Sequence, residues 1–413
     1  MHDEPDRGTS HARSQPVSRV GGEPFRARSQ RRQVVRALSH RNFQLFFGGQ
    51  LISLIGTWMQ SVAQAWLVYR LTGSTVALGM VGFSGQFPVF LLAPIGGAVA
   101  DRYGRRRILV GTQSAAMLLA FVLAALTLMD AVRVWHIFAV AGVLVASIGE
   151  GWCFFVNAVS CIAVIVGLLL MDITLHVRVP LAGSARAEIG EGFRFVGRTS
   201  PVLALLLLLG VVSLMGMPYA VLMPIFADRI LHGGASGLGL LMGASGVGAL
   251  AGALTLASRQ GVRGLGRWVA LSCAGFGVSL VLFSLSRSFW LSAALLVPTG
   301  FSMMVQMAAS NTLVQTMVPD ALRGRVMATY SMMFMGMAPF GALLAGMLAG
   351  HIGAPNTVAL GGAVCIIGAI VFGLRLPALR HEARQIIVAL QMAGGDPAEE
   401  VTGEGSVVAP RDA

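Results

Sequence analysis

The sequence contains no lysine and few charged residues of any kind. Only 12% of its 413 residues are Asp, Glu, Lys or Arg, about half the share in a typical soluble protein. The charges gather at the two ends and in short clusters, which leaves long stretches with none. The composition therefore excludes a soluble protein and indicates one that crosses a membrane several times.

Cysteine is also scarce, and no cysteine pair has the spacing of a disulfide framework or a zinc site. The four cysteines lie inside apolar stretches: Cys153, Cys161, Cys273 and Cys365. The sequence has no phosphate-binding loop, nucleophile elbow or zinc-binding helix. We therefore predict no metal, no cofactor and no enzymatic activity, and an ATP-driven pump within this chain is excluded.

All 30 basic residues are arginine, and they give the chain a net charge of +12. In a soluble protein this balance would favour nucleic acid binding, because clustered arginines neutralise phosphates. Here most arginines flank apolar stretches, where they orient helices in a bilayer. We therefore expect the lipid bilayer as a partner, and no nucleic acid.

Charge-free stretches long enough to cross a bilayer, at about 20 residues each, predict ten membrane-spanning helices. They are 43–69, 75–99, 108–129, 151–171, 201–227, 236–257, 268–286, 288–317 and two within 326–374 that are separated by a turn at His351–Asn356. A further apolar segment, 134–149, has only 16 residues. The sequence thus predicts an all-α polytopic membrane protein with about 10 to 11 transmembrane helices.

These stretches divide the chain into five parts. Residues 1–41 are rich in Arg, Ser and Gly and cannot bury enough surface to fold alone, so we expect a disordered basic cytoplasmic tail. An N-terminal helical bundle, 42–171, is followed by a central cytoplasmic linker, 172–200. A C-terminal six-helix bundle, 201–377, ends in a polar cytoplasmic tail, 378–413.

The distribution of arginine predicts the orientation of the helices. Between residues 42 and 374 there are 17 arginines. If the amino terminus is cytoplasmic and 134–149 does not cross, 13 of them lie inside and four lie outside; if it crosses, six lie inside and 11 outside. Because arginine concentrates on the cytoplasmic side, we expect both termini there and no simple crossing of 134–149.

One motif lies between the second and third predicted helices, in the stretch GAVADRYGRRR at 97–107. Gly97 permits a close helix approach, Gly104 permits a tight turn, and Asp101 can cap a helix or pair with arginine. The motif resembles the signature of the major facilitator superfamily, in its usual place. Its matching residues are Gly97, Asp101, Arg102, Gly104, Arg105 and Arg106. The arginines also fit a simpler interpretation as topological anchors.

The resemblance covers most of 38–380 and is to the branch of transmembrane secretion effectors and enterobactin-exporter-like proteins. It implies two bundles of six helices and a motif that acts as a conformational switch. It further implies a secondary active transporter of the bacterial inner membrane that exports small drug-like or siderophore-like molecules by alternating access. Protons as the coupling ion are implied by the resemblance alone, because no predicted span contains an acid or His at its centre.

An internal repeat indicates that the first half is shortened. The pairs Ile148/Ile352, Gly149/Gly353, Cys161/Cys365 and Ile162/Ile366 share an offset of 204, whereas Trp135/Trp290 has an offset of 155. The difference of 49 predicts a break near 138–141, where the first half lacks the equivalent of roughly 295–343. The alternative function is therefore a transport-incompetent relative, either a membrane-binding or regulatory protein or the product of a gene deletion.

Polar residues at helical spacing predict a substrate cavity, with polar packing between helices as the alternative. One stripe lies in the first span: Ser53, Thr57, Gln60 and Gln64. A second follows Thr299 in the span at 288–317: Ser302, Gln306 and Ser310. Pro218 and Tyr219 are expected to mark a bend near the same cavity. Gly336, Pro339 and Gly341 predict a kink and close helix packing in a later span.

Overall fold

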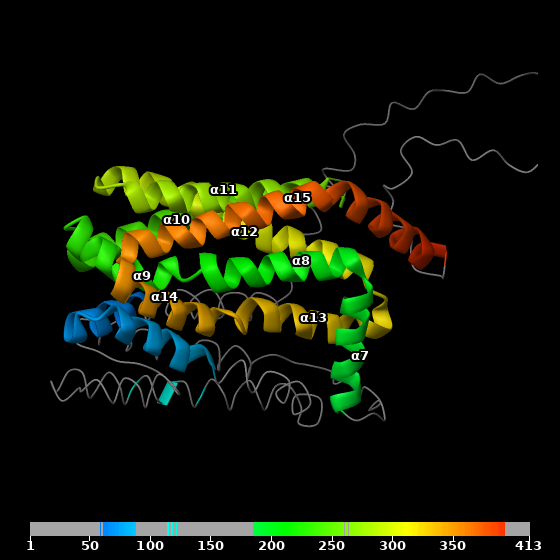
Figure 1. The fold of residues 1–413 in the computed structure, drawn as a ribbon, viewed down its shortest axis with the longest axis horizontal. Helices are drawn as coiled ribbons and strands as arrows, with labels where there is room; N and C mark the ends of the chain where they lie inside the picture. The colour runs from blue at the N-terminus through cyan, green and yellow to red at the C-terminus, as the bar shows by residue number, and fades with distance from the viewer. Residues whose placement is uncertain are drawn as a thin grey trace, which may run out of the picture.

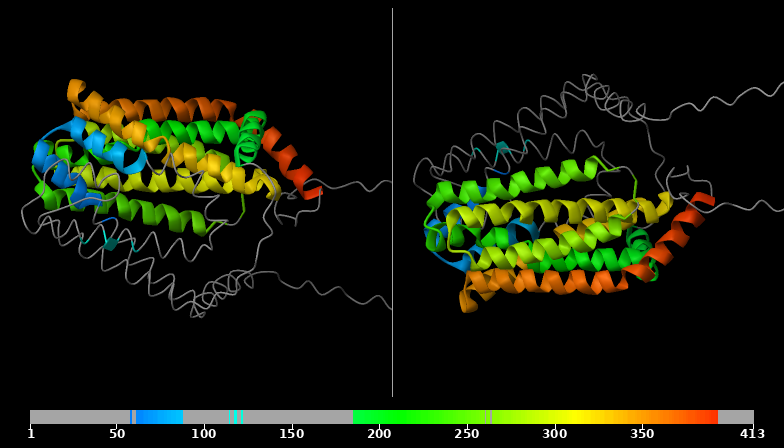
Figure 2. Two further views of the ribbon diagram at one scale, coloured as in Figure 1. Left: turned by 90° about the horizontal axis from the view of Figure 1, so that it is seen from below. Right: turned by 90° about the horizontal axis from the view of Figure 1, so that it is seen from above.

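The computed structural model describes residues 58, 61–87, 114, 117, 118, 121, 185–259, 261, 262 and 264–392. Within these residues the secondary structure is helical, and no strand occurs among them. Figures 1 and 2 show most of the helices side by side along one axis. The predicted all-α class is confirmed for this part of the chain.

The helices before α7 span residues 61–72 and 75–87. The others are α7 (Ala185–Arg198), α8 (Ser200–Val211), the π-helix η1 (Val212–Gly216), α9 (Tyr219–Ile225), the π-helix η2 (Phe226–Ile230), α10 (Gly234–Ala257), α11 (Leu265–Leu285), α12 (Phe289–Met317), α13 (Asp320–Met335), α14 (Ala338–Ile352) and α15 (Ala354–Met392).

Six segments of the described chain are long and apolar enough to cross a membrane. They are Ser200–Ile230, Gly234–Ala257, Leu265–Leu285, Phe289–Met317, Leu322–Ile352 and Ala354–Leu390. The first four agree within three residues with the predicted stretches. The last two meet at the predicted turn, where Gly353 has a φ of 83°, a value that favours glycine.

The helices 61–72 and 75–87 form a tight hairpin. Gly73, with a φ of 59°, donates its N–H to the carbonyl of Tyr69 at 2.7 Å and so ends the first helix. Ser74 Oγ then accepts the N–H of Ala77 at 3.3 Å, which caps the second helix. The remainder of the predicted N-terminal bundle lies almost wholly outside the described residues.

The span Ser200–Ile230 is broken near its middle. Pro218 has no N–H to donate to Leu214, and the chain passes from the π-helix η1 through a turn at Met217–Pro218 into α9. If Gly341 of α14 carried a Cβ atom, that atom would lie 2.4 Å from the carbonyl oxygen of Leu214, which is too close for two atoms that are not bonded. Glycine at 341 therefore lets the broken span and α14 touch backbone to backbone.

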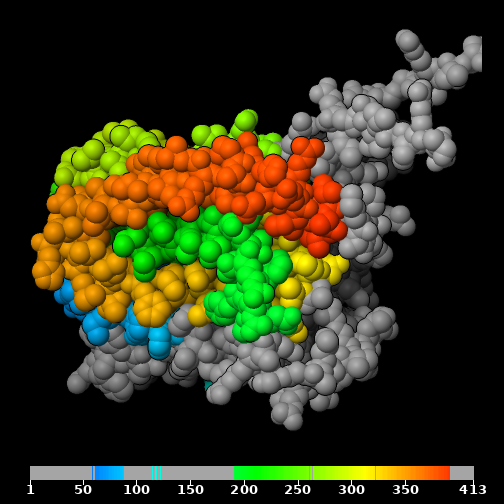
Figure 3. All heavy atoms as spheres, turned by 45° about the vertical axis from the view of Figure 1, so that its right-hand side comes forward, coloured from blue at the N-terminus to red at the C-terminus, as the bar shows by residue number. Residues whose placement is uncertain are grey.

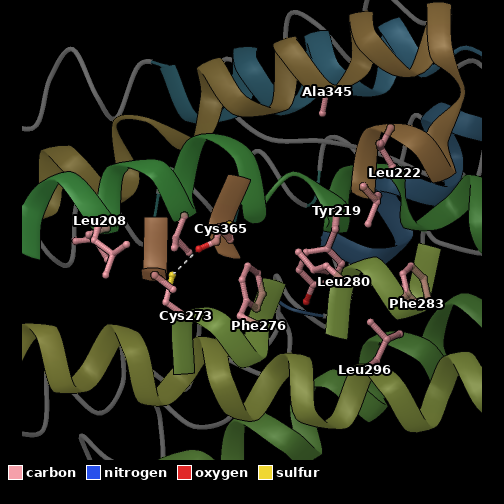
Figure 4. Close-up of a cluster of buried hydrophobic side chains, with 14 of the residues drawn as sticks. Leu208, Tyr219, Leu222, Cys273, Phe276, Leu280, Phe283, Leu296, Ala345 and Cys365 are labelled. Atoms are coloured by element: carbon pink, nitrogen blue, oxygen red, sulfur yellow. Dashed lines mark hydrogen bonds between the residues drawn. The ribbon is translucent and has the colours of Figure 1, made fainter. Parts of the chain in front are cut away.

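The core lies between the spans. Neighbouring helices pack in the order α10, α12, α11 and α15. The helix α15 also contacts α8. Figure 4 shows part of the buried cluster, with Phe276 and Phe283 of α11 facing Tyr219 and Leu222 of α9. On one face of the molecule α15, α8 and the α13–α14 pair lie side by side (Figure 3).

The outer surface of the spans is apolar. Its exposed side chains include Leu250 and Leu254 on α10, Leu271 and Leu285 on α11, and Leu374 on α15. Lipid chains are as apolar as these side chains, so an apolar exterior is the expected surface of a membrane protein. The last part of α15, beyond Pro377, turns away from the bundle axis (Figure 1).

Candidate functional site

The two ends of the bundle both carry arginine, and we name them by it. The arginine-rich end holds Arg198, Arg259, Arg267, Arg323 and Arg325; the far end holds Arg70, Arg229 and Arg287. The helix α7 crosses the arginine-rich end, and the hairpin 61–87 lies at the far end (Figure 1).

At the far end, side chains join the hairpin to η2. Tyr69, which is 5% exposed, donates its hydroxyl to Asp228 Oδ2 at 2.8 Å. Arg229 donates to the carbonyl of Gly73 at 3.2 Å, and its guanidinium carbon lies 5.6 Å from the centre of the Tyr69 ring. We call Tyr69, Gly73, Asp228 and Arg229 the far-end latch. It joins residues more than 150 positions apart.

Next to the latch, the helix 75–87 lies directly on α14. A Cβ at Gly79 would lie 2.6 Å from the carbonyl oxygen of Ala342, and a Cβ at Gly346 would lie 2.7 Å from that of Thr75. A Cβ at Gly82 would meet the Ala342 side chain at 3.0 Å. We call these contacts the glycine seam. They bring the two backbones together, and beside them the rings of Phe83 and Phe87 contact the ring of Phe340 in α14.

We expect the hydrogen bond of the latch to contribute measurably, because a bond to a charged acceptor is worth about 1.5–3 kcal/mol. Tyr69→Phe and Asp228→Asn should each lower the thermal midpoint of the purified protein. The double variant should lose less than the sum of the two, with a coupling of about 1 kcal/mol. Thermal unfolding of all four proteins measures this, and strictly additive losses would show that the two side chains act independently.

The predicted residue Tyr219 starts α9, just after the break in its span. Its side chain is buried, and its hydroxyl lies 3.0 Å from Ser245 Oγ of α10. Ser245 is also where α10 and α12 touch: a Cβ at Gly300 would lie 1.8 Å from the Ser245 carbonyl oxygen. A polar contact thus lies at the meeting point of α9, α10 and α12.

The predicted stripe on α12 lies inside the bundle. Thr299 and Ser310 are fully buried, Gln306 is 1% exposed and Ser302 is 7% exposed. Ser302 faces α11, where its Oγ would lie 3.0 Å from a Cβ at Gly275. Gln306 Nε2 and Ser310 Oγ have no hydrogen-bond partner among the described residues, so this pair retains donors for another polar group. A substrate contact there stays a prediction.

The predicted kink residues lie around the junction of α13 and α14. Gly336 follows the end of α13, and Pro339 stands in the first turn of α14, where its missing N–H costs no helical bond. Gly341 lies where α14 contacts the broken span, at the carbonyl oxygen of Leu214. Of the first-span stripe, the structure describes Gln64, which is half-buried. Outside the described residues lie Ser53, Thr57, Gln60, Gly97, Asp101, Arg102, Gly104, Arg105 and Arg106.

At the arginine-rich end, α7 is tied to α13. Arg325 forms an ion pair with Glu191, and a Cβ at Gly192 would lie 3.1 Å from the Arg325 side chain. Arg323 pairs with Asp320 one turn earlier. Among the described residues, no group of three or more His, Cys, Asp or Glu could hold a metal ion.

The second half also holds a degenerate copy of the 97–107 motif, which the sequence reasoning missed. The stretch Ser258-Arg259-Gln260-Gly261 follows the second span of this half, as Asp101-Arg102-Tyr103-Gly104 follows that of the first. Gly261 has a φ of 77°, and the Arg259 guanidinium lies 4.8 Å from the Trp268 ring centre. The spacing Arg-x-Gly directly after a predicted span could have revealed this copy of the motif.

Comparison with protein families identifies the chain. Residues 34–140 and 138–408 match the family described as "Transmembrane secretion effector". The two matches together cover most of the chain. They meet at 138–140, where the internal repeat changes its offset.

Individual relatives agree with this family. The staphyloferrin A transporter of Staphylococcus aureus (strain NCTC 8325 / PS 47) is 33% identical over 82 residues, which are 20% of this chain and only 21% of that protein. A solved structure of a mutant of the nucleoside transporter NupG has a TM-score of 0.60 at 12% identity, over 81% of this chain and 99% of that one. Another structure of NupG has a TM-score of 0.53 at 12% identity, over 83% of this chain and 99% of that one.

At such identity the NupG structures show the fold alone, and they support two-bundle helical architecture. The family match extends over both halves of the sequence, and the described spans are those of a multi-pass membrane protein. The chain belongs to the transmembrane secretion effector family of major facilitator transporters.

Proposed function

We propose that this protein exports small drug-like or siderophore-like molecules across the bacterial inner membrane by alternating access. In this proposal the arginine-rich end and both termini are cytoplasmic, and protons drive export. The export direction is supported by the description of the family, and a siderophore-like substrate by the name of the staphylococcal relative. The 13-to-4 division of arginines supports the orientation.

The observation that carries the proposal is the way in which the hairpin meets the second half. The far-end latch consists of one partly buried and one exposed hydrogen bond, and the glycine seam consists of close contacts that are mostly between backbones. The backbones meet at Gly79 and Gly346, and beside them the ring of Phe340 contacts the rings of the hairpin, so the halves join here through a small set of contacts that a conformational change can break. This is what a transporter needs where its two halves part.

When the far end opens, the two halves would close at the arginine-rich end. There the motif of 97–107 is proposed to hold the two halves together when the far end opens, with Asp101 pairing to arginine. The ion pair between Glu191 and Arg325 fixes α7 to α13 at the same end, so the linker helix would move with the second half. Tyr219 and Ser245 offer hydroxyls to a polar substrate.

A second candidate function is supported by the split of the family match at 138–140. If the first half lacks the equivalent of roughly 295–343, one wall of the transport path is missing. The protein would then be a shortened relative that binds the membrane or regulates another transporter. The two candidates differ in a single property, which is net movement of substrate.

We expect cells that express the full chain to accumulate less of a panel of apolar dyes than cells with empty vector. Asp101→Asn should reduce the efflux rate by at least about tenfold, because it removes a contact that distinguishes the two transporter states. The matched control is Asp396→Asn, the same chemical change in the polar tail, which should export like the parent. Dye fluorescence over time measures the rate.

Immunoblots of the membrane fraction confirm that each variant is present. If the parent and the Asp396→Asn control both match empty vector while present in the membrane, export is excluded for these dyes and the shortened, non-transporting relative is favoured. Collapse of the proton gradient with an ionophore should abolish efflux. Efflux that survives the ionophore would contradict proton coupling.

A further inference from the structure

The arginines at the arginine-rich end fall into two groups. On the side of α7 and α13, Arg325 pairs with Glu191 and Arg323 pairs with Asp320. On the side of α11 and α15 no carboxylate of the described residues pairs with them. This second group comprises Arg259, Arg267, Arg375, Arg380 and Arg384, with Glu382 as the acid nearest in sequence to the last two. A local excess of positive charge therefore lies along the α11–α15 edge.

Two of these arginines converge. The first turn of α11 packs on α15, where a Cβ at Gly266 would lie 3.0 Å from Leu376. Arg267 follows Gly266 directly and Arg380 lies about one helical turn beyond Leu376, so both arginines lie next to this packing contact. Arg380 Nη2 is buried and has no hydrogen-bond partner among the residues that the structure describes. A buried charged donor without an acceptor costs free energy, so an anion that accepts its hydrogen bond would stabilise this arrangement.

The position of the pair along the helices fits the level of lipid headgroups. Leu271 of α11 and Leu374 of α15 are 70% and 78% exposed and belong to the apolar exterior. At 1.5 Å per residue, Arg267 lies about 6 Å and Arg380 about 9 Å beyond these leucines along their helices. Phosphate groups of a bilayer lie just outside its apolar core, at this depth.

We propose that Arg267 and Arg380 form a binding site for a phosphate group at the arginine-rich end, between α11 and α15. Guanidinium groups suit this ligand, because their planar donors match phosphate oxygens in pairs. The amino terminus of α11 adds positive potential, since its Gly264 cap provides no side-chain acceptor. The phosphate comes from an anionic lipid headgroup or from a soluble phosphate, and the experiment separates the two sources.

The test uses the full chain, purified in detergent, and measures its thermal midpoint with added lipid. We expect phosphatidylglycerol to raise the midpoint by about 3 °C or more, because a ligand that binds only the folded state stabilises it. Arg267→Gln/Arg380→Gln should lose at least two thirds of this rise. The matched control Arg384→Gln, an equal loss of charge at an exposed position of the same helix, should keep it.

Two further additives identify the source. Phosphatidylcholine controls for filling of the detergent micelle, and inorganic phosphate at constant ionic strength tests a soluble anion. A rise with phosphatidylglycerol alone assigns a headgroup, and an equal rise with inorganic phosphate assigns a soluble ligand; both sustain the site if they depend on the two arginines. The proposal is overturned if the double variant keeps the full rise, or if neither phosphate source stabilises the parent.

If the glutamine variant does not purify in folded form, Arg267→Lys/Arg380→Lys takes its place. Lysine keeps both charges but cannot offer paired donors to one phosphate. We expect this variant to lose at least half of the rise caused by phosphatidylglycerol. If the lysine variant keeps the full rise in thermal midpoint, charge alone attracts the lipid, and a site that depends on paired guanidinium donors is contradicted.

Discussion

Gly248→Ala is expected to destabilise the protein severely, with a thermal midpoint at least about 5 °C below that of the parent. A Cβ at Gly248 of α10 would lie 1.8 Å from the carbonyl oxygen of Val297 and 2.7 Å from its carbon. Both are backbone atoms of α12, so no side chain can turn away. The two helices must separate, and overpacking of this kind costs about 1–3 kcal/mol and sometimes more.

The matched control lies on the same helix. A Cβ at Gly243 would meet nothing within 4 Å. Both substitutions gain the same helix propensity, about 1 kcal/mol in favour of alanine, so their difference isolates the contact with α12. Gly243→Ala should be as stable as the parent or slightly more stable. Equal midpoints for the two variants would show that α10 and α12 do not touch at Gly248.

The second large effect is expected from a crosslink across the glycine seam. A Cβ at Gly350 would lie 3.4 Å from Thr75 Oγ1 and 3.6 Å from a methyl carbon of Val76. A cysteine at 75 would place its sulfur near the position of Thr75 Oγ1, and in a disulfide the Cβ of one cysteine lies about 3 Å from the sulfur of the other, so a small adjustment closes the bond. With the four native cysteines replaced by alanine, Thr75→Cys/Gly350→Cys should lose nearly all efflux on oxidation, because the far end can no longer open. Dithiothreitol should restore it.

The crosslink has internal controls. Each single cysteine variant should export equally well before and after oxidation, and gel mobility of a proteolysed sample measures the crosslinked fraction. Continued efflux from fully crosslinked protein would mean that transport does not require the seam to part. That result would remove the far end as a gate while leaving the family assignment untouched.

The positions of the spans could be predicted because charge is excluded from a bilayer, and this single rule marked both ends of α10, α11 and α12 closely. The turn at Gly353 was equally visible, since glycine and proline interrupt an apolar stretch there. The break around Pro218 was predicted only as a bend. The π-helices η1 and η2 could not be predicted, because each is a widened helical turn that accommodates an extra residue, and no residue type or pattern marks such a turn in the sequence.

The candidate site was harder to predict, because its contacts join distant parts of the chain. Asp228 and Arg229 looked like ordinary residues at a span end, and nothing in the sequence marks Tyr69 as the partner of Asp228. On α12 the helical spacing predicted a polar face, but spacing cannot tell which neighbour that face meets. Ser302 meets the backbone of α11 at Gly275, where a small residue leaves room.

The turn at Gly73 and Ser74 has a consequence for how the far end responds to change. With only two residues between capped helices, the segments 61–72 and 75–87 move as one body. In the proposed transport cycle, latch and seam therefore open in one cooperative event, and their free energies add in one equilibrium. A change of about 1 kcal/mol at either alters the ratio of open to closed protein about fivefold. The short turn thus makes the balance between the two states finely adjustable by single substitutions at widely separated positions.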